Sequence, residues 1–202
     1  MAQLVIASMR AVDGELRIIR ADSTDMSTTF VVAVGKPYRV GSDGQVGDIW
    51  GGLLIRNSGV GFASLLMVAH LVVLRCLNGL CAPLPDAVLL RRRHRGIADD
   101  KLRLMLAGRL QDLPGMLRHA GDTLHAATLR QVDDVEATVR GVLAAGGLPL
   151  RVLQPIMDAF QHEPSPTVFG ISQALTLAAQ RFSPEERLQL EQAAGQYLRT
   201  LG

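Results

Sequence analysis

The amino-acid sequence predicts an α+β fold: a β-rich half of antiparallel hairpins over residues 1–96, followed by about five helices over residues 97–202 that pack on it in one domain. Two observations indicate this fold class. In the first half apolar residues alternate with polar ones between glycine-rich turns, whereas in the second half they recur at helical spacing between capping residues. With 48% hydrophobic and 20% charged residues, the 202-residue chain is long and apolar enough to fold around a core.

Turn residues separate the strands expected in the first half. Leu4 and Ile6 alternate with small or polar residues, and residues 15–21 repeat this pattern after Asp13-Gly14, a dipeptide typical of tight hairpins. Residues 28–35 and 48–58 predict two further strands, separated by a glycine-rich stretch with a turn at 42–44. The glycines of 56–61 predict a hairpin that leads into the apolar run 62–80. That run fits a buried strand to about Val68, and its length also allows a short buried helix afterwards.

The helical pattern begins after Gly96. An apolar stripe from Leu102 to Leu113 predicts the first helix, and residues 117–127 predict a second. Asp133 is expected to cap a third helix that ends at Gly146-Gly147. Three more start signals follow, at Pro149, at Thr167 and in the capping box of Ser183, Pro184 and Glu186.

The composition does not suggest a membrane or a secreted protein. The most apolar stretch, residues 60–74, is interrupted by Ser64 and His70 and is shorter than the roughly 20 residues that span a bilayer. The N-terminus has no cleavable small-residue site after a hydrophobic region, and the chain has only two cysteines. We therefore expect a cytoplasmic protein with reduced thiols and no membrane partner.

Basic residues cluster at residues 91–96, Arg-Arg-Arg-His-Arg-Gly, after a loop with two prolines. The net charge of +2 is too small to indicate a polyanionic partner by itself. Evidence for such a partner therefore has to come from the distribution of charge along the chain. All of the 21 basic residues except Lys36 and Lys101 are arginines, which bind phosphate bidentately. In an extended backbone Arg91, Arg93 and Arg95 project to one side at about 6.6 Å spacing, close to the phosphate repeat of an extended single strand, and Arg92 and His94 project to the other.

We therefore expect the chain to bind single-stranded DNA by neutralising its backbone, without a cofactor and without covalent chemistry. Besides the run, the expected nucleic-acid-binding residues are Arg56, Arg39, Asn57 and Lys36. Aromatic residues make up only 4% of the chain, so base stacking on the candidates Trp50, Tyr38 and Phe62 cannot be extensive. Two other interpretations of the arginine run stay open: a solvated strand end and a surface for an acidic protein.

Four segments carry a resemblance to a known family. In order they are IRNSGVGFASL (55–65), RCLNGL (75–80), RRRHRG (91–96) and GISQALTLAAQ (170–180), and together they resemble a large family of phage- and plasmid-borne proteins of unknown function. This chain departs from the family pattern at Gly59, where the family has an acidic residue, and at Gln173, where it has asparagine. The resemblance implies recombination, replication or defence evasion on a mobile element, and it raises the expectation of DNA binding. By analogy with strand-annealing proteins, we expect a homo-oligomer with helices at its interfaces.

Enzyme chemistry is the weaker expectation. Cys76, Cys81 and His94, with or without His70, lack the second close ligand pair of a zinc site, and Cys76 with His94 matches no nucleophile signature. The paired carboxylates at 99–100 and 133–134 are explained by helix N-termini, and the glycine-rich stretches lack the lysine of a phosphate loop. A protein-binding factor acting against host defence remains the second interpretation, and a thiol- or metal-dependent enzyme the third.

Overall fold

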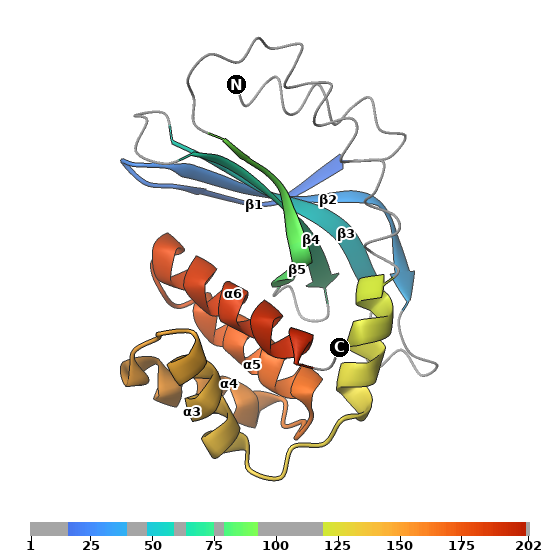
Figure 1. Ribbon diagram of the computed structural model, residues 1–202, viewed down its shortest axis with the longest axis vertical. Helices are drawn as coiled ribbons and strands as arrows, with labels where there is room; N and C mark the ends of the chain where they lie inside the picture. The colour runs from blue at the N-terminus through green and yellow to red at the C-terminus, as the bar shows by residue number, and fades with distance from the viewer. Residues whose placement is uncertain (1–15, 40–47, 59–63, 75–78, 93–118, 201–202) are drawn as a thin grey trace.

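The computed structural model describes residues 16–39, 48–58, 64–74, 79–92 and 119–200, and it confirms the α+β architecture, with strands first and helices after (Figure 1). The described strands form one five-stranded sheet in the order β1-β2-β3-β4-β5, so each strand pairs with its neighbour in the chain. All four pairings are antiparallel. The strands are β1 Leu16–Ser23, β2 Thr28–Arg39, β3 Asp48–Asn57, β4 Leu65–Leu74 and β5 Gly79–Arg92.

Tight local hydrogen bonds form the turn between β1 and β2. The backbone N–H of Thr24 donates to the carbonyl of Ser27 at 2.8 Å, and the Thr24 hydroxyl accepts from the N–H groups of Met26 and Ser27 at 3.3 and 3.1 Å. The predicted strand of residues 15–21 is therefore confirmed as β1. The arm around Leu4 and Ile6, with the turn at Asp13-Gly14, lies outside the described residues.

The antiparallel pairing of β3 with β4 confirms the hairpin predicted around residues 56–61, although residues 59–63 themselves are not described. β4 continues as a strand to Leu74, so the alternative of a buried helix after Val68 is wrong. The reason is its place in the sheet: β4 lies between β3 and β5, and both Met67 and Val68, which point to opposite faces, are buried. A strand buried on both faces reads as a continuous apolar run, which by periodicity alone resembles a buried helix.

β5 corrects the expectation of a loop before the arginine run. Both prolines of that segment, Pro83 and Pro85, lie within the strand. Proline cannot donate a backbone hydrogen bond, and it is tolerated here because β5 is the last strand in the described order, with one side that pairs with no described strand. The register with β4 also shifts between Val68 and His70, where strict pairing is already broken.

Five α-helices follow in the described part of the second half, and each corresponds to one of the helices predicted there. The first covers residues 119–129 and confirms the prediction for 117–127, whereas the predicted helix from Leu102 to Leu113 lies outside the described residues. The others are α3 Val135–Ala145, α4 Leu153–His162, α5 Val168–Ala179 and α6 Pro184–Arg199, with a short 3-10 turn at Leu150–Val152 before α4.

Capping residues explain where these helices begin and end. Thr167 and Ser183 cap α5 and α6 as predicted, by accepting from the N–H groups of Gly170 and Glu186. The cap of α3 is Asp134 and not Asp133, because the carboxylate of Asp134 is the one that reaches the N–H of Ala137 at 2.9 Å. α3 stops at Gly146-Gly147 as predicted, and Gly147 has φ +63, which favours glycine.

The helices form two layers below the sheet. α5 and α6 lie against β5, and Figure 1 shows α3 and α4 on the side of these helices that faces away from the sheet. The helical core consists of small and branched apolar side chains that are almost completely buried, among them Leu143, Ile156, Ile171, Leu175 and Leu190. Within the described ranges, no helix combines the length and the apolar character that crossing a membrane would require.

Candidate nucleic-acid interface

Arg56 and Arg91 lie in one row across the sheet. Arg56 on β3 pairs with Leu66 on β4, and Leu66 pairs with Arg91 on β5. Residues that pair directly across neighbouring strands project from the same face of a sheet. The two arginines therefore point to the same side, two strand spacings or about 10 Å apart at the backbone. We call Arg56 and Arg91 the arginine row.

Both guanidinium groups of the arginine row remain without a carboxylate in the described part of the chain. Arg91 is exposed, and Arg56 is half-buried. The Nε of Arg56 donates to the hydroxyl of Ser27 at 3.3 Å, and Ser27 is buried in the turn between β1 and β2. The hydroxyl thus orients Arg56 without neutralising its charge.

The nearest carboxylate in the same row belongs to Asp22, which is already engaged. Asp22 pairs with Thr29, and Thr29 pairs with Arg56. The Asp22 carboxylate forms an ion pair with Arg20, whose Nε lies 2.8 Å from Oδ2, and it accepts a hydrogen bond from Arg187 Nη1 at 3.2 Å. Two cations therefore hold this carboxylate at the β1 end of the row, and the charge of the arginine row stays available for an anion.

No further arginine of the run joins the arginine row within the residues that the structure describes. Arg92 is the last residue of β5 and pairs with Leu65, directly after Arg91, while Arg93, His94 and Arg95 lie outside the described residues. Arg39 lies ten residues beyond Thr29, the β2 partner of Arg56, which is roughly 30 Å along a strand.

Lys36 lies in the irregular segment of β2 between Val34 and Tyr38 and is exposed, roughly 20 Å from the row on the same scale. The structure therefore does not bring Arg39 or Lys36 to the arginine row.

Asn57 ends β3 next to Arg56, but no aromatic candidate reaches the row. Asn57 is half-buried, and its Oδ1 is buried without a hydrogen-bond partner in the described structure. An orphaned acceptor does not favour an anion, so only the amide nitrogen of Asn57 suits a phosphate. Trp50 lies six residues earlier on β3, Tyr38 lies at the far end of β2, and Phe62 is not described. Stacking on these three residues is therefore not part of the row.

A buried charged cluster joins β1 to α6, and the sequence analysis did not anticipate it. Arg20 donates to both carboxylate oxygens of Glu191, at 2.5 and 3.1 Å, and Glu191 is fully buried. Burial raises the pKa of the Glu191 carboxyl, and the Arg20 guanidinium opposes this rise. One signal was present in the sequence: Glu191 interrupts the buried stripe of α6 beside Leu190 and Ala194, where a charge needs a partner.

His70, which lies on β4, is the only buried histidine among those that the structure describes. It is fully buried, and neither ring nitrogen has a hydrogen-bond partner in the described structure. Burial, with a smaller contribution from the positive charge of Arg20, lowers the pKa of His70 to about 3. The imidazole is therefore neutral at physiological pH and contributes no charge toward a polyanion.

The described residues do not support a metal centre. No group of three or more His, Cys, Asp or Glu side chains within the described ranges has an arrangement that could hold a metal ion. His70 pairs with Pro83, and Cys81 pairs with Val72 on the same two strands, while Cys76 and His94 lie outside the described residues. The hypothesis of a thiol- or metal-dependent enzyme gains no support from these positions.

No protein-family model, no curated protein and no solved structure matches this chain. The resemblance to phage- and plasmid-borne proteins therefore stays a prediction, and the arguments for function come from the geometry.

Proposed function

We propose that this protein binds nucleic acid, and preferentially single-stranded DNA, by neutralising phosphates with the arginine row. The observation that carries the proposal is the register that places Arg56 and Arg91 on one face of the sheet, at the strand end where the arginine run continues. Guanidinium groups bind phosphate oxygens bidentately, and such contacts give affinity without sequence preference.

The charge environment of the row supports this proposal. An arginine that is tied to a carboxylate contributes little to binding an anion, whereas Arg56 is oriented by a neutral hydroxyl and Arg91 is exposed. The two side chains are long enough to reach phosphates of an extended strand from positions about 10 Å apart. We favour a single strand because such a strand can follow a row of cations, as in the grooves of known single-strand binders.

The test is a salt titration of oligonucleotide binding. A fluorescein-labelled oligothymidylate is titrated with the wild type and with the double variant Arg56→Gln/Arg91→Gln, and anisotropy is measured between about 50 and 200 mM salt. Each phosphate contact to a single strand contributes about 0.7 to the slope of log K against log salt, so losing two contacts lowers the slope by about 1.4. We also expect a loss of affinity of about tenfold or more at the lowest salt.

The matched control removes the same amount of charge elsewhere. Arg140→Gln/Arg151→Gln changes two exposed arginines of the helical layer that are paired with Glu136 and Glu186. This variant should keep the wild-type slope. If both double variants lower the slope equally, binding is unspecific charge attraction, and the arginine row is not the interface.

Assembly and location are further parts of the proposal. We infer a cytoplasmic homo-oligomer, by analogy with proteins that anneal strands, with the strand end that carries the arginine row toward the nucleic acid. Light scattering of the purified protein with and without the oligonucleotide tests this, and a monomer under both conditions contradicts it.

A further inference from the structure

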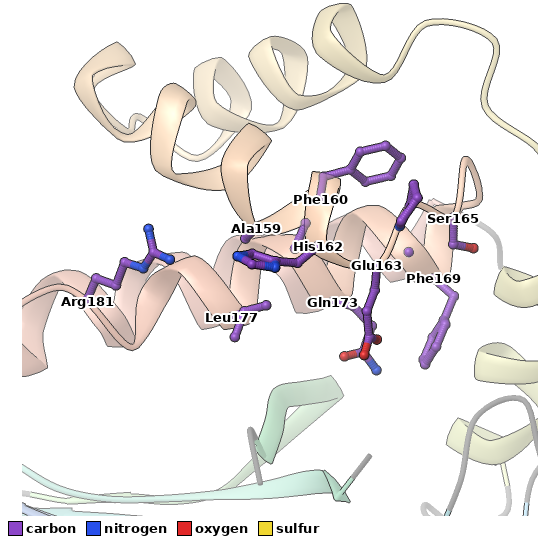
Figure 2. Close-up of a pocket in the computed structure, with 12 residues that line it drawn as sticks. Ala159, Phe160, His162, Glu163, Ser165, Phe169, Gln173, Leu177 and Arg181 are labelled. Carbon is purple, nitrogen blue, oxygen red and sulfur yellow. The ribbon is translucent and has the colours of Figure 1, made fainter. Parts of the chain in front are cut away.

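A pocket of about 640 Å³ opens along α5. Its walls are the last turn of α4, residues 163–165 after it, and one side of α5 (Figure 2). Phe160, Phe169 and Leu177 make it apolar, while His162, Gln173 and Arg181 add polar groups. Binding pockets for small molecules have volumes of about 300–1,000 Å³ and combine an apolar lining with a few polar groups.

A close backbone approach forms one wall of the pocket. A Cβ on Gly170 would collide with the backbone of Ser165, so only glycine lets the loop lie this close to α5. The hydroxyl of Thr167 accepts from the N–H of Gly170 at 3.0 Å and closes the same corner. A site with a preformed wall needs less ordering when a ligand binds.

Gln173 lines the pocket and carries a hydrogen-bond donor that no described residue uses. Its Nε2 is buried and has no hydrogen-bond partner among the residues that the structure describes. A buried donor without a partner is costly, and a ligand that brings an acceptor relieves this cost. A glutamine amide can donate to and accept from the edge of a nucleobase, and adenine suits it best because N7 accepts while N6 donates.

Cationic and anionic side chains lie at different places along the pocket. Glu163 and Arg181 both line the pocket, and Figure 2 shows Arg181 on the far side of Leu177 from Gln173. Arg181 is exposed and forms no ion pair with a described carboxylate, and His162 lines the same pocket. Arg181 follows Gln173 by eight residues and lies in the turn after α5, which ends at Ala179. An anionic group of a ligand therefore belongs at Arg181, on the other side of Leu177 from the amide of Gln173.

We propose that this pocket binds a nucleoside 5′-monophosphate unit, either a free nucleotide or the terminal unit of a strand. The base edge pairs with the amide of Gln173, its face packs on Phe169, and the phosphate binds Arg181 and His162. This site does not rest on the arginine row, since it lies on α4 and α5 and uses none of the same residues.

The test measures binding of AMP, adenosine and ribose 5-phosphate by isothermal titration calorimetry. Arg181→Gln should weaken AMP about tenfold or more and leave adenosine within about twofold, because it removes only a charge-assisted contact to phosphate. Gln173→Leu should weaken AMP and adenosine alike and leave ribose 5-phosphate unchanged. Arg140→Gln, an exposed arginine on α3, is the control and should change none of the three.

Absence of AMP binding up to millimolar concentration overturns the proposal, and so does equal weakening by Arg181→Gln and Arg140→Gln. Circular dichroism checks that each variant is folded. Arg181 is exposed, so its replacement should leave the core intact.

Two further measurements complete the test. The first identifies the source of the nucleotide, and the second distinguishes failure of the pocket from failure of the proposed function. If a 5′-phosphorylated oligonucleotide binds more tightly than its 5′-hydroxyl form and Arg181→Gln removes the difference, the unit is a strand end. AMP binding without that difference indicates a free nucleotide. Arg56→Gln/Arg91→Gln should leave AMP binding unchanged, so failure of the arginine row and failure of the pocket give different results.

Discussion

Replacing Arg20 by leucine should destabilise the fold more than any surface arginine does. Glu191 is fully buried, and only 15% of the Arg20 side chain is exposed, so the variant leaves a buried carboxylate without its bidentate partner. Breaking a buried ion pair from one side costs about 3–5 kcal/mol. For a chain of this size about 2–4 °C of melting temperature corresponds to 1 kcal/mol, which predicts a decrease of roughly 6–20 °C at neutral pH.

The loss in Arg20→Leu should depend on pH with a defined sign. Burial raises the pKa of Glu191 above its ordinary value of 4.5, and without the Arg20 guanidinium that pKa rises further. Above pH 4.5 the folded variant then holds a proton that the unfolded chain has lost, so its stability falls as pH rises through this window. The difference in unfolding free energy between wild type and variant should therefore be largest near neutral pH and smaller on acidification to about pH 5.

Urea denaturation followed by circular dichroism at both pH values measures this difference. A second substitution sharpens the test: Glu191→Gln should destabilise the wild type but stabilise Arg20→Leu, because an amide is less costly to bury without a partner than a carboxylate. The control Arg140→Leu breaks an exposed pair with Glu136 and should cost less than about 0.5 kcal/mol. A loss in Arg20→Leu that is independent of pH, or that grows when Glu191→Gln is added, refutes the reasoning.

Three other substitutions, two of them with a matched comparison variant, give expected outcomes for stability, all measurable by thermal or urea denaturation. His70→Leu removes two buried ring nitrogens without partners in the described structure and should stabilise the fold by about 1–3 kcal/mol. The stability gained by His70→Leu should grow as pH falls below 6.5. In the wild type the folded His70, with a pKa of about 3, stays neutral while the unfolded chain takes up a proton, which destabilises the fold. A gain that does not change with pH contradicts this expectation. In Gly170→Ala the new Cβ meets the backbone of the preceding loop, so the substitution should cost about 2–3 kcal/mol. Gly141→Ala, on the open side of α3, should instead stabilise the fold by about 0.5–1 kcal/mol. Equal effects of the two substitutions would exclude the close approach at Gly170. Asp134→Ala should cost about 1 kcal/mol and Asp133→Ala much less, and the reverse order would restore Asp133 as the cap.

Local signals in the sequence predicted much of the helical half. Ser183 with Pro184, Thr167 and the pair Gly146-Gly147 each act on backbone groups within a few residues, so their effect does not depend on the rest of the fold. The error at Asp133 was one residue, because two adjacent carboxylates offer the same capping chemistry and only the path of the chain selects one.

The strands were less predictable than the helices because pairing partners lie far apart in the chain. The apolar run of β4 fits a buried helix as well as a buried strand until its place between two other strands is known. The prolines of β5 favoured a loop, and only the place of β5 at the end of the described strand order makes them compatible with a sheet.

The sequence by itself determined the α+β order of this protein, the approximate positions of most described strands and helices, and the concentration of arginines after Leu90, because alternation, helical spacing and capping act over short distances. Only the tertiary structure decided which charges meet. It placed Arg56 in one row with Arg91 and left Arg39 at the far end of the sheet, and it brought Arg20 to Glu191 across 171 residues. Such contacts depend on strand order and register, which a chain acquires only when distant segments pack together.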